Sequence, residues 1–240
     1  MKILEIYEYL NTLSPFDIQE SWDNSGLLVG DFKEDISSVA LSIDVDEALI
    51  DSLEENTLLI THHPIIFGGL KQLEFSKYPA NLIQKMIKKN ISNIAMHTNF
   101  DQTHLNEYVA TEILGYEIIK KDGFVAYLEI NEDFDSFAKK VSTAFGLPHA
   151  RCVKTSNYVK IAALTTGSGC SLMRSLRADC FLTGDVKYHD AMEAKSINLS
   201  LIDIGHYESE KFFAEILQKY LKNLGLKVII ASSENPFTYI

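Results

Sequence analysis

The chain has 240 residues, of which 46% are hydrophobic and 23% charged, and its formal net charge is −11. This composition is ordinary for a globular protein of one large domain or two small ones. The negative charge argues against tight electrostatic binding to nucleic acid or to an anionic membrane surface. No apolar run approaches the length of a membrane span, and acidic residues interrupt the N-terminal segment, so neither a membrane helix nor a signal peptide is expected.

The three cysteines, Cys152, Cys170 and Cys180, lack the spacing of a metal site and cannot all pair with one another. They predict reduced thiols in a cytoplasmic protein.

Apolar periodicity predicts alternating helices and strands along the first half of the chain. The predicted helices are 3–13, 46–56, 78–90 and 103–115, the last with Thr103 as its N-cap. The predicted strands are 38–45, 57–61 and 91–98.

The second half repeats the alternation after the turn-like "KKDGF". The predicted strands are 125–130, 160–166, 180–184, 199–205 and 227–232. The predicted helices are 133–146, 171–178, 185–197 and 209–225, the last being the longest. Alternating strands and helices indicate an α/β fold with two lobes, residues 1–124 and 125–240, each with a mixed, largely parallel sheet flanked by helices.

Polar residues that commonly bind metals follow four of the predicted strands. Five of the seven histidines lie at these strand ends. The residues concerned are His62, His63, His97, Asp101, Asp185, His189, His206, Glu208 and Glu210. Open α/β sheets bind ligands beyond the carboxyl ends of their strands, so these side chains are expected to converge.

Imidazole and carboxylate groups without thiolates suit zinc, manganese, iron or cobalt. Adjacent residues of an extended chain point in opposite directions, so His62 and His63 are expected to serve two neighbouring ions. His206 and Glu210 have the i, i+4 spacing that places both on one face of a helix. Two ions roughly 3.5–4 Å apart form a hydrolytic pair.

Each segment also has an ordinary explanation when taken alone. His62 and His63 would make an unremarkable surface pair, Asp101 a helix cap, and "GHYESE" an acidic helix start that complements the helix dipole. The occurrence of all three at successive strand ends favours the metal site.

Six motifs, in order between residues 20 and 210, carry a family resemblance: "ESWDNSGLLVG", "THHPIIF", "HTNFD", "GSGCSL", "TGDVKYHDA" and "IDIGHYESE". They are similar to the signatures of the Nif-type dinuclear metal-centre family, whose members are also labelled GTP cyclohydrolase 1 type 2 homologues. The resemblance implies two α/β lobes with the metal site in the cleft between them, in a short form without an inserted domain, and a ring-shaped homohexamer. The ligands it implies are His62, His63, Asp101, His206 and Glu210.

The remaining candidates have open roles. His97 is predicted to carry protons, and Asp185 and His189 to orient ligands, although His189 fits a helix surface equally well. The turn Gly167–Gly169 would suit a phosphate or simply a tight strand-to-helix connection. Residues 22–26 are interpreted as a structural turn.

The sequence therefore predicts a hydrolase that uses two divalent transition-metal ions per chain, with zinc, iron or manganese as candidates. Its substrate would be a nucleotide or another small molecule bearing phosphate, with GTP cyclohydrolase-like chemistry as the narrowest form. The alternative is a non-catalytic, metal-binding oligomeric scaffold or regulatory protein.

Overall fold

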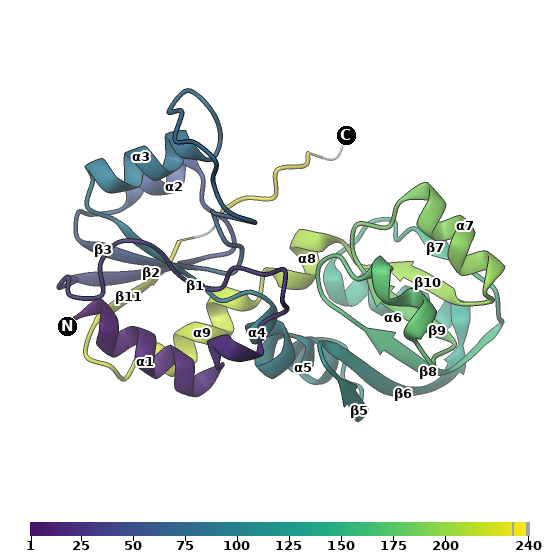
Figure 1. Ribbon diagram of the computed structural model, residues 1–240. Helices are drawn as coiled ribbons and strands as arrows, with labels where there is room; N and C mark the ends of the chain where they lie inside the picture. The colour runs from purple at the N-terminus through teal and green to yellow at the C-terminus, as the bar shows by residue number, and fades with distance from the viewer. Residues whose placement is uncertain (232, 239–240) are drawn as a thin grey trace. The chain divides into compact units, whose positions relative to one another are not determined.

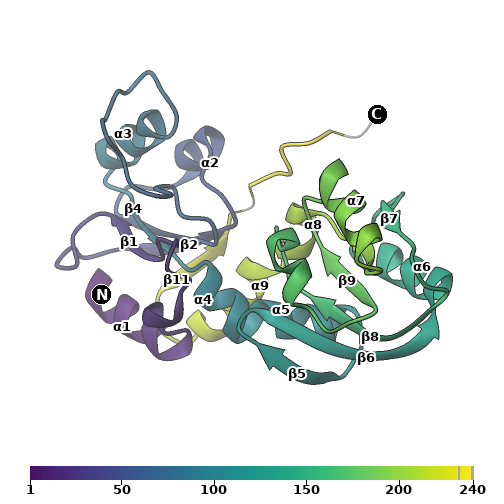
Figure 2. The ribbon, with the colours of Figure 1, turned by 45° about the vertical axis from the view of Figure 1, so that its right-hand side comes forward.

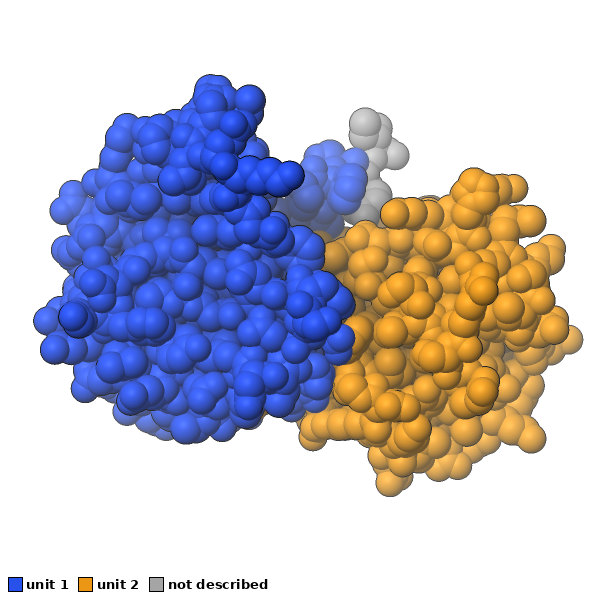
Figure 3. Space-filling model, in the orientation of Figure 1, with its two compact units in different colours: residues 1–103, 212–240 blue, residues 104–211 orange. Residues whose placement is uncertain are grey.

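The computed structural model describes residues 1–231 and 233–238, and the chain divides into two compact units. Unit 1 comprises residues 1–103 and 212–240, and unit 2 comprises residues 104–211 (Figure 3). The predicted lobes, 1–124 and 125–240, do not coincide with these units, because the C-terminal segment returns to pack on the first sheet.

Unit 1 contains a five-stranded sheet in the order β1-β4-β3-β2-β11. Its strands are β1 (Gly26–Val29), β2 (Ser38–Ser42), β3 (Thr57–Thr61), β4 (Ser92–Ala95) and β11 (Lys227–Ile230). All neighbours run parallel except β1, which pairs antiparallel with β4. The central strands β2, β3 and β4 are buried along their whole length, as expected for parallel strands covered on both faces. Residue 232, the end of the last predicted strand, lies outside the described residues.

Helices cover both faces of this sheet. In both ribbon views, α1 (Ile3–Leu13) and α9 (Phe213–Leu221) lie on one face, and α2 (Glu47–Ser52) and α3 (Ala80–Lys88) on the other (Figures 1 and 2). A short 3-10 helix, Phe16–Ile18, follows α1. The apolar stripe of α9 is buried, which explains why the C-terminal segment belongs to unit 1.

A helical segment follows β4 and runs from Thr98 to Ile113. It consists of α4 (Thr98–Phe100), a π-helical turn (Asp101–Leu105), α5 (Asn106–Tyr108) and a second π-helical turn (Val109–Ile113). The predicted N-cap at Thr103 is therefore wrong. The Thr103 hydroxyl instead donates to the carbonyl of Asn99, 2.9 Å away, from within the helix.

Unit 2 contains a six-stranded sheet in the order β5-β6-β8-β9-β10-β7. Its strands are β5 (Ile118–Asp122), β6 (Val125–Asp133), β7 (Cys152–Val153), β8 (Tyr158–Leu164), β9 (Cys180–Thr183) and β10 (Ser200–Asp203). Only β8, β9 and β10 run parallel, and the outer pairings are antiparallel. The predicted α/β fold with two mixed sheets is confirmed, although the second sheet is less parallel than the first.

After α5 and the second π-helical turn, the remaining helices of unit 2 are α6 (Phe134–Phe145), a 3-10 helix (Cys170–Ser175), α7 (Tyr188–Ser196) and α8 (His206–Glu210). The 3-10 helix and α7 pack with alternate residues of the sheet, including Ala163 and Phe181. The predicted longest helix, 209–225, is wrong. The chain forms α8 and α9 there, with a break between them, and α6 is longer than either. Within the described residues, no helix is both long and apolar enough to cross a bilayer.

Candidate metal centre

His62 and His63 directly follow β3. The backbone N–H of His62 donates to the carbonyl of Ser42, the last residue of β2, and that of His63 to the carbonyl of Ile43, so both residues are held at the carboxyl end of the central strands. His62 Nδ1 lies 2.9 Å from the carbonyl oxygen of Met96, and His63 Nδ1 lies 2.8 Å from Oδ1 of Asp44. A carbonyl can only accept a hydrogen bond, so Nδ1 of His62 is the donor and Nε2 is the nitrogen left to bind a metal.

His97 follows β4 and is held in the same manner. Its Nδ1 lies 2.8 Å from Oδ1 of Asp23, whose side chain is fully buried. Burial by itself raises the pKa of the Asp23 carboxyl, but the hydrogen bond and charge of His97, the Thr98 hydroxyl and the Asn24 amide more than offset it. The pKa of Asp23 therefore lies well below its usual range, and the carboxylate stays ionised to fix the imidazole.

The three imidazoles form one cluster. One ring nitrogen from each of His62, His63 and His97 can be chosen so that all three lie within 4.8 Å of one another. His62 and His63 both lie beyond the last residue of β3, and their ring centroids are 5.1 Å apart. Asp101 joins this group, with Oδ1 3.5 Å from Nε2 of His62. Unit 1 thus brings together four of the predicted site residues.

Unit 2 holds the other two predicted ligands on a single helical turn. Nε2 of His206 lies 3.0 Å from Oε2 of Glu210, as the i, i+4 spacing on α8 predicts. The other imidazole nitrogen, Nδ1, lies 2.7 Å from Oδ2 of Asp185. Asp185 therefore orients His206, as the sequence suggested.

The glycine turn before the 3-10 helix packs directly against Glu210. A Cβ at Gly167 would lie 2.1 Å from Oε1 of Glu210, and the φ of Gly167 is +61°, a conformation that favours glycine. The N–H groups of Gly167 and Gly169 donate to the hydroxyls of Ser209 and Thr183. Because these donors are used internally, the structure favours the tight-turn interpretation over a phosphate cradle.

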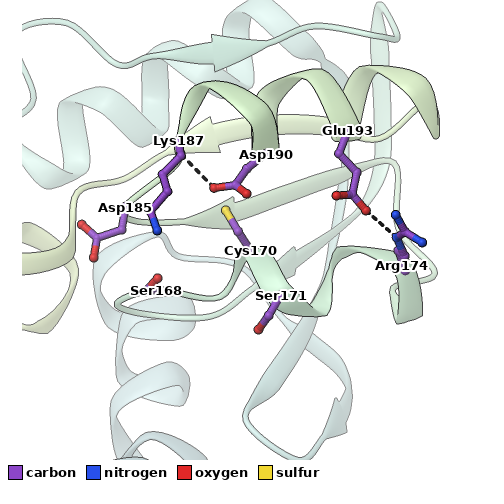
Figure 4. Close-up of a pocket in the computed structure, with 8 residues that line it drawn as sticks. All are labelled: Ser168, Cys170, Ser171, Arg174, Asp185, Lys187, Asp190 and Glu193. Atoms are coloured by element: carbon purple, nitrogen blue, oxygen red, sulfur yellow. Dashed lines mark hydrogen bonds and ion pairs between the residues drawn. The ribbon is translucent and has the colours of Figure 1, made fainter.

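A cavity of about 420 Å³ lies beside this turn in unit 2 (Figure 4). Polar and charged side chains line it, among them Asp185, Lys187 and Cys170. Burial, followed by the charges of Asp190 and Asp203, raises the pKa of the Cys170 thiol to about 12. Cys170 is therefore a neutral thiol at physiological pH rather than a nucleophile.

His189 and Glu208 have other neighbours. His189 is exposed on α7, where its ring contacts that of Tyr188, so the helix-surface interpretation fits it. The carboxylate of Glu208 folds back toward the backbone of Gly205 instead.

Sequence reasoning missed Asp23 and Asp44, the two carboxylates that hold His97 and His63. Asp23 belongs to the segment interpreted as a structural turn. Asp44 lies near the end of the predicted strand 38–45, so the strand-end rule that selected the histidines would also have selected it.

The donor chemistry of these residues fits divalent metal ions. In each of His62, His63, His97 and His206, Nδ1 lies within 3 Å of an oxygen acceptor. This arrangement is typical of metal-binding histidines, because the bonded nitrogen fixes the tautomer and aims the other nitrogen at the metal. Imidazole nitrogens and carboxylate oxygens without thiolates suit zinc, iron and manganese.

Comparison with known proteins defines the class to which this fold and site belong. The family model described as Duf34/NIF3 (NGG1p interacting factor 3) matches residues 1–236, so the chain belongs to the Duf34/NIF3 family. The resemblance inferred from the six motifs is thereby confirmed.

Particular relatives match over essentially their whole length. A protein of Campylobacter jejuni named GTP cyclohydrolase 1 type 2 homolog is 52% identical, and the match covers 100% of both chains. A protein of Helicobacter pylori named GTP cyclohydrolase 1 type 2 is 43% identical over 99% of both chains. The crystal structure of a hypothetical protein from Staphylococcus aureus, 26% identical, has a TM-score of 0.85 and covers 100% of this chain and 99% of that one.

Proposed function

We propose that this protein is a metal-dependent hydrolase that binds two divalent transition-metal ions per chain and acts on a nucleotide. One observation carries the proposal. We call the clustered side chains of each unit a donor set: His62, His63, His97 and Asp101 in unit 1, and His206 and Glu210 in unit 2. Each of the four imidazoles has its Nδ1 held by an oxygen, from Met96, Asp44, Asp23 or Asp185. Such anchoring serves a histidine that must present Nε2 in one fixed direction.

The proposed ligands are the five implied by the family motifs: His62, His63, Asp101, His206 and Glu210. We propose that each donor set contributes ligands to metal binding. When bound, two such ions supply an activated water and neutralise charge that develops on the leaving oxygen.

His97 has a separate proposed role as the proton carrier. Its Nδ1 is fixed by the buried Asp23 carboxylate, and its ring centroid lies 5.2 Å from that of His62. An imidazole beside a metal-binding cluster can accept a proton from the attacking water and deliver it to the leaving group.

The names of the relatives guide the choice of substrate. Proteins 43% and 52% identical to this chain are called GTP cyclohydrolase 1 type 2 or its homolog, so GTP is the first nucleotide to test. We further propose a homohexamer, as the family resemblance implies, in a reducing compartment such as the cytoplasm. The three cysteines, all free thiols in the structure, agree with such a compartment.

The test combines metal content, turnover and particle mass for the wild-type protein and the Asp101→Asn variant. Wild type is expected to contain close to two zinc, iron or manganese ions per chain and to consume GTP. The variant removes one ligand charge and is expected to keep the oligomer while losing turnover. Wild type that contains no metal and takes up none on addition would contradict the proposal. A variant that retains full activity would also contradict it, and one that falls apart would favour a structural metal and the scaffold alternative.

A further inference from the structure

Two exposed aromatic side chains lie beside the histidine cluster of unit 1. Trp22 is 52% exposed and Phe67 is 59% exposed. Their ring centroids are 5.9 Å apart, and each ring meets His97 edge to face, at 6.0 Å for Trp22 and 6.3 Å for Phe67. We call Trp22 and Phe67 the aromatic platform.

The platform is held in place by the residues between and around its two rings. Asn24, two residues after Trp22, donates from Nδ2 to the carbonyl of Ile66, 2.6 Å away and directly before Phe67. Asp23, next to Trp22, anchors His97. The loop that carries Trp22 is thereby tied both to the loop that carries Phe67 and to the imidazole cluster.

The faces of the Trp22 and Phe67 rings do not cover each other and can stack on another ring. The planes of Trp22 and Phe67 are inclined by 53°, so neither ring covers the other face to face. Burying a large aromatic side chain is favourable, so two exposed rings fixed beside a polar cluster need a reason. A planar heteroaromatic ring matches them in size and in preferred stacking geometry.

We infer that the aromatic platform stacks against the base of the nucleotide and so positions it beside the imidazole cluster. This inference rests on the proposed function in taking the reacting molecule to be a nucleotide. Stacking needs only a π face, which every base has. The platform therefore positions the base without selecting guanine over adenine, and any choice between them must come from polar groups elsewhere.

The sequence provides a direct probe, because Trp22 is the only tryptophan in the chain. Its fluorescence reports on the platform alone. Guanosine, adenosine and GTP are expected to quench it in saturable titrations, in both the metal-depleted and the metal-loaded protein. Ribose and tripolyphosphate, which have no aromatic ring, are expected to leave it unchanged.

Variants separate stacking from a merely structural role. Trp22→Ala and Phe67→Ala are each expected to raise KM for GTP by roughly 5- to 100-fold, the range for losing one base–aromatic stack, with a smaller change in kcat. Trp22→Phe is expected to restore most of the loss. Tyr158→Ala removes another exposed aromatic residue, on β8, and is expected to leave KM and kcat for GTP unchanged.

The outcomes distinguish this inference from the proposed function. Quenching by guanosine without any GTP hydrolysis supports the platform and counts against the hydrolase. Hydrolysis with unchanged KM in both alanine variants overturns the platform and leaves the hydrolase. Fluorescence that responds to protein concentration and not to nucleosides also overturns it, because a second copy of the chain would then cover the rings.

Discussion

The two donor sets are built in different ways. In unit 1, His62, His63 and His97 come from the ends of two strands, and their anchors Asp44 and Asp23 come from two further segments. In unit 2, His206 and Glu210 lie one helical turn apart, with Asp185 as the anchor. The first set depends on correct assembly of a sheet, whereas the second is largely encoded in five consecutive residues.

The contrast concerns burial as well. Among the imidazoles, His62 is completely buried, whereas a third of the His206 side chain is exposed; the carboxylates Asp101 and Glu210 are buried in both sets. His62 therefore cannot adjust easily when a neighbouring ligand changes, because side chains fill the space around it. We expect substitutions in unit 1 to have larger effects on metal binding than substitutions in unit 2.

The largest effect is expected from replacing both adjacent histidines. His62→Ala with His63→Ala should lower metal occupancy and any GTP turnover by more than roughly 100-fold, because loss of an anchoring partner alone costs 10- to 100-fold. Elemental analysis and a turnover assay measure both, and light scattering should still show the wild-type oligomer. Retention of both ions would mean that the donors of unit 2 suffice by themselves.

Next in size is the choice between two glutamates of α8. Glu210 is buried and lies 3.0 Å from His206, whereas Glu208 turns toward Gly205. Glu210→Gln is expected to weaken metal binding by roughly 10- to 100-fold and Glu208→Gln to have little effect, because a neutral amide is a weaker ligand than a carboxylate. Metal competition titrations on the two variants show which carboxylate binds the metal. Equal losses would show that the wrong carboxylate has been identified.

A smaller effect is expected at the turn that supports Glu210. In Gly167→Ala the new methyl group would overlap Oε1 of Glu210, so the carboxylate must move and metal affinity should fall several-fold. The matched control is Gly146→Ala, at a φ of +71° with no atom within 4 Å of the new Cβ. Both variants should lose roughly 1–2 kcal/mol of stability from the left-handed backbone, but only Gly167→Ala should lose metal. Thermal unfolding combined with metal titration separates the two effects, and equal metal affinity in both variants would contradict the packing argument.

The smallest effect concerns the thiol in the cavity of unit 2. Because the pKa of Cys170 is raised to about 12, its thiolate fraction is small at pH 8 and increases as the pH approaches that value. Alkylation of Cys170 followed by mass spectrometry should be much slower at pH 8 than for free cysteine and accelerate with pH. Asp190→Asn removes one of the negative charges that raise the pKa and should speed the reaction a few-fold. A rapid reaction of the wild-type Cys170 thiol at pH 7 would contradict the raised pKa.

Several features could be predicted because they depend on neighbours in the sequence. The buried parallel strands β2, β3 and β4 form continuous apolar runs, and the spacing of His206 and Glu210 requires only that a helix begin there. The short strands β1, β5 and β7 were not predicted. Each pairs antiparallel at or near a sheet edge, where the partner strand supplies the stabilisation and the segment's own pattern is weak.

Other features were decided only by tertiary structure. Residues 213–230 belong with the first sheet because α9 buries its apolar face there and β11 adds beside β2, a choice among possible partners that no local pattern contains. Likewise, the sequence identified His62, His63 and His97 as strand-end residues, but only the parallel register of β3 and β4 brings their rings together. Asp23 and Asp44 became recognisable as anchors once the folded chain had placed them against the imidazoles, because a hydrogen bond between residues 74 or 19 positions apart leaves no periodic trace in the sequence.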